Sequence, residues 1–166
     1  MKHGLMQPSL ALAALLAGLA PLAAAQSNTG SITATAVVQQ PISVTGAVNL
    51  SFGNVFPGVP ATVLLTDAGA GRFDVAGQAN APVTLSFTAL PANLGFGLNN
   101  LPVAFTSGYN AANNAAGATS FTPASGATTS LSGTGVLFVF VGGTVTPAVN
   151  QAAGTYTGTI TLQVAY

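Results

Sequence analysis

The chain closes on a strict alternation of side chains, GTYTGTITLQVAY over residues 154–166. From position 156 the odd positions carry Thr, Gln and Ala, whereas the even positions carry Tyr156, Gly158, Ile160, Leu162, Val164 and Tyr166. A period of two is typical of a β-strand with one face on an apolar core and the other face in water. The segment therefore predicts a strand over 155–166, and that strand needs a partner.

The same signal recurs in short runs along the chain. Runs rich in β-branched and aromatic residues are separated by Gly, Pro and Asn, and no stretch after the first 25 residues has helical periodicity. The predicted strands cover 31–38, 42–45, 48–52, 61–66, 72–76, 83–88, 102–106, 128–131, 136–145 and 155–166. We therefore expect an all-β fold in which two antiparallel sheets pack together.

The first residues have the composition of an export signal. A short basic start precedes an apolar, alanine-rich run that ends in small residues before Gln26. This arrangement is typical of a secretory signal peptide over 1–25 that is cleaved before Gln26. A retained membrane anchor is the alternative, although a span takes about 20 predominantly apolar residues. The expected layout continues with an extended N-terminal strand over 26–40 and a β-sandwich domain over 41–166.

Charge is almost absent from residues 26–166. Asp67, Arg72 and Asp74 are their only charged side chains, and they contain no His, Lys, Glu or Cys. Acid–base and nucleophilic catalysis need groups of this kind, zinc and iron–sulfur sites need Cys or His, and nucleic-acid binding needs a basic surface. We therefore expect no enzyme, no metal or cofactor, no nucleic-acid partner and no small-molecule substrate.

The three charges lie close together in the segment DAGAGRFD. Simple ion pairing of Arg72 with the aspartates is the preferred interpretation. A weak calcium site made by Asp67 and Asp74 with backbone carbonyls is the alternative, although Ca²⁺ takes roughly 6 to 8 oxygen ligands. Because no cysteine is present, the fold depends on its core, its strand pairing or its neighbours. A net charge this close to zero favours association of protein molecules.

Two runs make specific predictions about packing. The segments RFDVAG and VTLSFTAL are separated by the turn-forming GQANAP, which predicts a hairpin. Its apolar side chains are Phe73, Val75, Val83, Leu85 and Phe87. The run at 136–145 is apolar on both faces, so it is either a central strand covered twice or a strand whose outer face meets another molecule.

Residues 107–133 are small, polar and rich in turn formers. They are longer than a normal hairpin connection, so we expect a surface insertion with one irregular strand inside it. A plain flexible insertion is the preferred interpretation. A binding loop is the alternative, with Tyr109 and Phe121 as its aromatic contacts.

The N-terminal run ITATAVVQQPISV places small and apolar side chains on one face of an extended strand. That face carries Ile32, Ala34, Ala36 and Val38, whereas Thr33 and Thr35 lie on the other. Such a strand pairs either with its own domain or with the sheet edge of a second copy by β-strand addition. Burial of Ile32 and Val38 contributes about 1.5 to 3 kcal/mol each.

Two of these segments resemble bacterial pilins. The closing GTYTGTITLQVAY is similar to the C-terminal strand of fimbrial subunits and of spore coat protein U-like secreted proteins, and VNLSFGNVFPG at 48–58 is similar to their early strand and Phe-Gly turn. With TGSITATAVVQQPISV, the chain looks closest to an uncharacterised bacterial family of secreted β-rich proteins related to those pilins. The resemblance is strongest at 30–58 and 135–166 and weak through 107–133.

The resemblance implies an immunoglobulin-like pilin sandwich that passes through the periplasm and is displayed on the cell surface. In chaperone–usher pilins the sandwich lacks one strand, which a periplasmic chaperone lends before the N-terminal extension of the next subunit replaces it at an outer-membrane usher. Here the residues that match the donated strand are Ile32, Ala34, Ala36 and Val38. Those that match the C-terminal strand are Tyr156, Ile160, Leu162, Val164 and Tyr166.

The expected function is a structural subunit of a surface fibre, a homopolymer held together by strand addition. Many pilins carry a disulfide that this chain lacks, which leaves open whether the chain completes its own sandwich. In that case a self-contained secreted adhesin or carbohydrate-binding module is the alternative, with 107–133 as the ligand surface. Amyloid-like matrix assembly through VLFVFV is a third possibility, because this run combines β-propensity with no charge and no proline.

Overall fold

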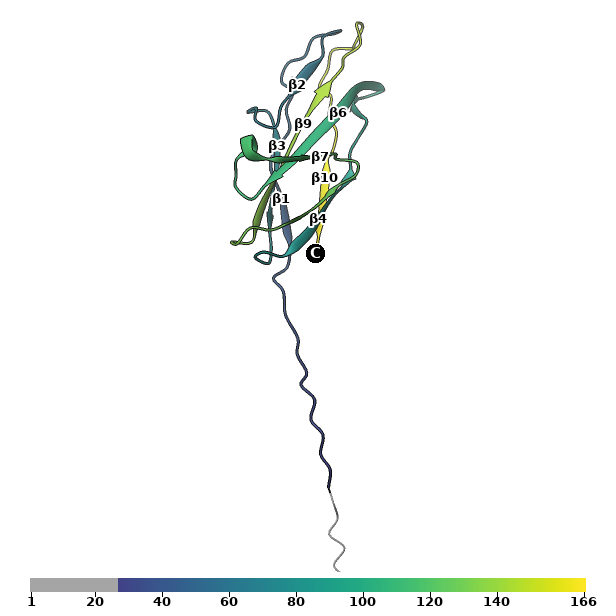
Figure 1. The fold of residues 1–166 in the computed structure, drawn as a ribbon. Coiled ribbons are helices and arrows are strands. Elements are labelled where there is room, and N and C mark those ends of the chain that lie inside the picture. Colours follow the sequence, from purple (N-terminus) through teal and green to yellow (C-terminus); the bar gives the residue numbers. More distant parts are fainter. Residues whose placement is uncertain (1–26) are drawn as a thin grey trace, which may run out of the picture. The chain divides into compact units, whose positions relative to one another are not determined.

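The computed structural model describes residues 27–166, so the predicted signal peptide over 1–25 and its cleavage before Gln26 lie outside the described residues. The chain divides into two units, 1–36 and 37–166, and every strand found within 27–166 belongs to the second (Figure 1). Residues 27–36 of the first unit form neither helix nor strand, and their side chains are exposed. The described part contains no helix with the length and hydropathy of a membrane span.

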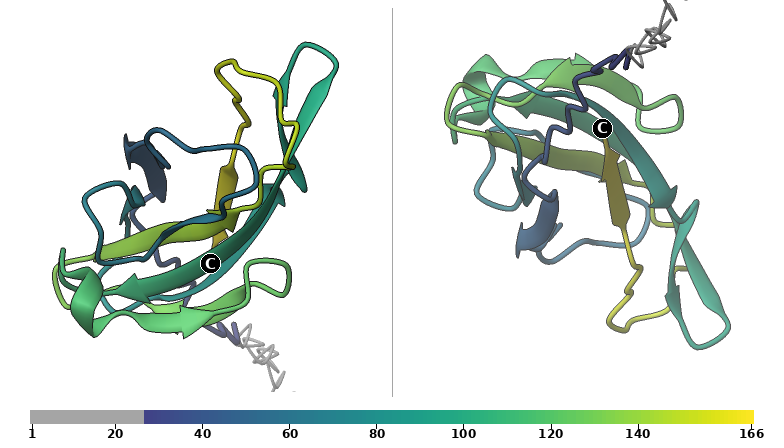
Figure 2. Two further views of the ribbon diagram at one scale, coloured as in Figure 1. Left: turned by 90° about the horizontal axis from the view of Figure 1, so that it is seen from above. Right: turned by 90° about the horizontal axis from the view of Figure 1, so that it is seen from below.

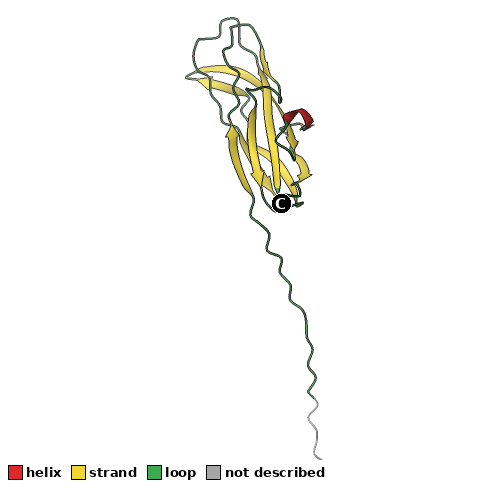
Figure 3. Cartoon of the chain, turned by 90° about the vertical axis from the view of Figure 1, so that its left-hand side faces the viewer, coloured by secondary structure: helices red, strands yellow, loops and turns green. Residues whose placement is uncertain are grey.

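The second unit is built from antiparallel strands, so the predicted all-β fold is confirmed (Figure 3). Its strands are β1 (Ser43–Val48), β2 (Ala61–Val63), β3 (Gly71–Ala76), β4 (Pro82–Ala89), β5 (Asn93–Phe96), β6 (Asn99–Asn110), β7 (Thr119–Phe121), β8 (Ala127–Ser130), β9 (Val136–Val145) and β10 (Thr161–Ala165), with one 3-10 turn, η1 (Ala115–Gly117). One sheet has the order β1-β3-β9-β6-β5, in which β2 also pairs with β9 and β7 with β6. The other sheet has the order β10-β4-β8.

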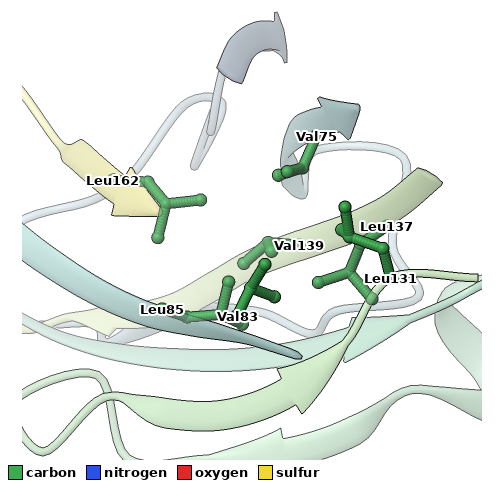
Figure 4. Close-up of a cluster of buried hydrophobic side chains, with 7 residues drawn as sticks. All are labelled: Val75, Val83, Leu85, Leu131, Leu137, Val139 and Leu162. Carbon is green, nitrogen blue, oxygen red and sulfur yellow. The ribbon is translucent and has the colours of Figure 1, made fainter. Parts of the chain in front are cut away.

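The core lies between the two sheets (Figure 4). The larger sheet contributes Val75, Leu137 and Val139, and the smaller sheet contributes Val83, Leu85 and Leu162, with Leu131 beside them. The Phe73 and Phe87 rings meet edge to face with centroids 6.5 Å apart. Full burial of each large apolar side chain stabilises the fold by about 1.5 to 3 kcal/mol, which is how a chain without disulfides can hold together.

β9 is the central strand of the larger sheet, as one of the two interpretations predicted. It pairs with β3 on one side and β6 on the other, and its bounds agree with the predicted 136–145. Leu137 and Val139 face the core, whereas Phe138 on the other face lies 5.9 Å beneath the guanidinium of Arg72. Because both faces are covered in this way, the strand is apolar on both.

The hairpin predicted between 72–77 and 83–90 is wrong. β3 belongs to the larger sheet and β4 to the smaller one, so the connection over 77–81 crosses between sheets. Asn80 in this connection adopts a positive φ of 58°. Turn-forming residues mark where the chain changes direction, but they do not distinguish a hairpin from a crossover. The apolar residues named for the hairpin still face one another, although across the core.

The closing strand is shorter than the predicted 155–166. Only Thr161–Ala165 pairs as a strand, with β4, and residues 154–160 have a single bridge, from Thr157 to Gly95. At the other end of the domain sequence, one strand over 43–48 replaces the two predicted over 42–45 and 48–52. The alternating sequence pattern therefore includes 154–160, although no neighbouring strand pairs with most of that segment.

Residues 107–133, expected as a surface insertion, contribute to both sheets. They contain the end of β6, η1, β7 and β8, and β8 pairs with β4 in the smaller sheet. Ser107 is buried, and its hydroxyl donates a hydrogen bond of 2.8 Å to the carbonyl of Phe121. Tyr109 and Phe121, proposed as aromatic contacts of a binding loop, pack against the core with ring centroids 5.9 Å apart.

Candidate functional site: a groove between β1 and β10

β1 and β10 each have one unpaired edge within residues 27–166. β1 is the last strand of the larger sheet and pairs only with β3, and β10 is the last strand of the smaller sheet and pairs only with β4. Figure 2 shows the two strands at the same margin of the sandwich, and the gap between them is narrow, since some of their Cα atoms lie within 8 Å of each other. A cavity of about 390 Å³ opens there, lined by Ile42 and Val44 on one side and by Leu162 and Val164 on the other.

A larger cavity of about 1130 Å³ follows along the same gap. One wall is the end of β1 and the segment 49–56, and the other is the segment 154–158 with Ile160. The floor consists of apolar side chains from four strands: Phe73 of β3, Leu94 of β5, Leu101 of β6, and Val141 and Val145 of β9. We call the two cavities together the β1–β10 groove.

Local hydrogen bonds hold the first wall in place without a strand. The N–H of Ser51 donates to the carbonyl of Gly69 at 2.8 Å, and the N–H of Gly58 donates to the carbonyl of Ala148 at 3.0 Å. Gly58 adopts a positive φ of 74°, which a residue with a side chain rarely takes. Beyond the end of β1, this wall is therefore a loop and not a strand.

The second wall is fixed at two residues. Thr157 and Gly95 exchange backbone hydrogen bonds of 2.8 and 3.0 Å. The hydroxyl of Tyr156 donates to the carbonyl of Ala152 at 2.8 Å and accepts from the side-chain amide of Gln151 at 2.7 Å. Apart from that single bridge, the segment leaves its backbone without a strand partner in the described chain. The wall is thus held in place at Tyr156 and Thr157.

The lining of the groove carries no Asp, Glu, His, Lys, Arg or Cys. The charged residues lie elsewhere: Arg72 pairs with Asp74 at 2.7 Å, and the carboxylate of Asp67 accepts a hydrogen bond of 2.8 Å from the N–H of Leu64. The predicted ion pair is therefore confirmed for Asp74 but not for Asp67. The groove is thus uncharged, with an apolar floor and with Asn and Thr side chains in its walls. It suits an uncharged occupant, because a buried charge without a partner is costly.

Four of the five predicted C-terminal residues line this groove. Tyr156 and Ile160 line its larger part, and Leu162 and Val164 line its smaller part. Tyr166, 47% exposed, lies beyond the end of β10. The predicted donor residues Ile32, Ala34, Ala36 and Val38 belong to no strand, and all four side chains are exposed. Exposure reaches 97% for Ile32 and 94% for Val38.

The sequence did not predict the floor of the groove or its first wall. Leu94 lies on β5, a short Gly- and Asn-rich strand without a clear signal. The sequence shows that Phe73, Val141 and Val145 are apolar. It does not show that a groove would remain open above them. No model of a known protein family matches the sequence, and no curated protein matches it either.

Proposed function

We propose that this protein is a structural subunit of a bacterial surface fibre and that it polymerises non-covalently by β-strand addition. The observation that carries the proposal is the β1–β10 groove, an open, uncharged groove with an apolar floor next to two unpaired strand edges. The occupant is the N-terminal extension, residues 27–40, of a second copy. In this proposal the domain is an immunoglobulin-like sandwich of the pilin type that lacks one strand.

The side chains of the extension match the groove in chemistry. Ile32 and Val38 are almost fully exposed, so burial in a groove would contribute about 1.5 to 3 kcal/mol for each. Ala34 and Ala36 lie between them on the same face and let the added backbone approach closely. The extension carries no charge, so insertion leaves no buried ion without a partner.

Backbone pairing adds to this contribution. An added strand would pair with the free edge of β10 and supply partners for its N–H and C=O groups, each hydrogen bond contributing about 0.5 to 1.5 kcal/mol net. At about 3.3 Å per residue, the seven positions from Ile32 to Val38 extend over roughly 20 Å. Because every contact is apolar or backbone, such an assembly needs no cysteine and no charge pair.

The same groove implies that a free subunit needs protection before assembly. An open groove with an apolar floor and an exposed strand edge favour aggregation in a free subunit. We propose that the chain is secreted, that a periplasmic chaperone occupies the groove in transit, and that an outer-membrane usher exchanges the chaperone for the next subunit. The proposed role is structural, since the groove offers no acid–base or nucleophilic group other than hydroxyls.

Negative-stain electron microscopy of the protein beginning at Gln26 tests the proposal. The comparison is a double variant, I32D/V38D, in which two exposed side chains become charged without a change in the domain core. We expect fibres from the native protein and dispersed particles from the variant. Dispersed native particles, in the presence of the cognate chaperone and usher, would contradict fibre assembly.

That outcome would favour a self-contained adhesin or carbohydrate-binding module. One observation supports this second candidate: Phe52, Phe56, Tyr156, Asn49 and Asn54 all line the larger part of the groove. Aromatic faces and amide groups are the kinds of side chain that bind sugars and other uncharged ligands. Binding of an oligosaccharide by dispersed native protein, with its loss in N49A/N54A, would identify that role.

A further inference from the structure

The hydroxyl of Tyr166 makes two hydrogen bonds where the N-terminal extension joins the domain. It donates to the backbone carbonyl of Gln40 at 2.5 Å and accepts from the backbone N–H of Gln78 at 2.7 Å. The N–H of Gln40 in turn donates to the side-chain oxygen of Gln78 at 3.3 Å. Three points far apart in the sequence are thereby tied together.

The local structure leaves space for this hydroxyl. Gly77 lies beside it, and a Cβ at that position would lie 2.7 Å from the hydroxyl oxygen and 2.9 Å from a methyl carbon of Leu131. A side chain at Gly77 would therefore clash with Tyr166 and Leu131, and at least one of them would have to move. The N–H of Gly77 donates to the carbonyl of Gly135 at 2.8 Å, which fixes the turn after β3.

Within the part of the chain that the structure describes, Gln40 is the only one of residues 37–41 that forms a hydrogen bond. Its neighbours Val37 and Val38 are 88% and 94% exposed. Pro41 follows with a fixed φ and disfavours a helical conformation of Gln40. The backbone is thus held at Gln40, immediately before β1 begins at Ser43.

We infer that Tyr166 is a positioning residue that fixes the direction in which the N-terminal extension leaves the domain, and that it thereby stiffens the junction between successive copies of a fibre. The inference rests on the proposed function. Tyr166 directly follows β10, the strand whose free edge accepts an extension in that proposal. Tyr166 therefore connects β10, where a subunit receives the extension of another copy, to the base of the extension that the same subunit donates.

The test is Y166F, which keeps the ring and removes both hydrogen bonds. Y109F removes a hydroxyl for which the described structure has no hydrogen bond, and S107A removes a buried hydrogen bond remote from Gln40. All three are made in full-length protein carrying I32D/V38D, so that each stays monomeric for NMR relaxation of the backbone amides of residues 37–40. These controls separate positioning from a general loss of stability.

In the parent protein and both controls we expect an order parameter near 0.85 at Gln40, and in Y166F a value below about 0.6. In the native background, Y166F should still form fibres, but with a shorter persistence length than the native, Y109F and S107A fibres. An unchanged order parameter at Gln40 in Y166F would overturn the inference. Loss of fibres in Y166F would also overturn it, since Tyr166 would then act in strand acceptance.

Failure of the proposed function is distinguishable from failure of this inference. If the native protein forms no fibres at all, the proposed function fails, and a loss of order at Gln40 in Y166F still supports the positioning role. If native fibres form and the Y166F order parameter and fibre stiffness are both unchanged, the positioning role fails and the proposed function stands.

Discussion

Val37 and Val38 offer a matched pair of substitutions within the N-terminal extension. They are adjacent, have the same side chain, and are 88% and 94% exposed, so neither supports the fold of the free subunit. Successive side chains of a strand point to opposite faces. An inserted extension that buries Val38 with Ile32 therefore leaves Val37 on the outward face, and V38A and V37A should differ sharply.

The expected magnitude follows from the atoms removed. Val to Ala deletes two carbons, which at about 0.8 kcal/mol per buried CH₂ amounts to about 1.6 kcal/mol of lost binding free energy for V38A. At about 1.4 kcal/mol per factor of ten, the dissociation constant should rise about 15-fold. V37A deletes the same atoms from a solvated face, so its dissociation constant should change by less than about twofold.

The assay is fluorescence anisotropy with labelled peptides of residues 27–40. Native, V38A and V37A peptides are titrated into full-length I32D/V38D protein, whose own extension cannot compete and whose β1–β10 groove is intact. Equal weakening by both substitutions would refute the alternation argument. A peptide that fails to bind in any form would refute occupancy of the groove by the extension.

Other substitutions test the groove and the fold. I160A, in the wall of the groove, should weaken peptide binding roughly three- to tenfold, whereas T159A, on the exposed face, should not. L85A should lower the free energy of unfolding by about 2 to 5 kcal/mol in urea denaturation. G135A, at a φ of 77°, should cost at least about 1 to 2 kcal/mol in the same measurement. R72L should cost only about 1 kcal/mol, since the Arg72 side chain is 24% and its partner 39% exposed, and a much larger loss would contradict that surface placement.

The sequence predicted the elements whose pattern arises from burial. β9 was predicted to its exact bounds because both faces are covered and every position from Val136 to Val141 is apolar. β3 and β4 were predicted to within one residue at each end, since each alternates against the core. The pairing between them was wrong because turn chemistry at 77–81 carries no information on whether the chain stays in its sheet.

The sequence predicted the groove only on one side. Ile160, Leu162 and Val164 were recognised as the apolar face of a closing strand, and they lie in the groove. The floor of the groove could not be predicted. Which apolar side chains remain uncovered depends on the order of the strands in space, and the pattern of a single strand does not give that order. Residues 155–160 were predicted as part of a strand because they alternate, although the described chain gives them only one bridge, at Thr157.

Cysteine cross-linking between two differently tagged copies tests the central claim most directly, since the sequence contains no cysteine. One copy carries T35C on the outward face of its extension. The other carries I32D/V38D and one cysteine on the exposed face of its closing segment, at Thr159, Thr161 or Gln163. The account predicts a disulfide-linked pair of both tags that forms strongly at one position and weakly at the other two. Equal or absent cross-linking at all three positions would contradict strand addition between subunits. So would a cross-link that forms only within a single copy when both cysteines are placed in that copy.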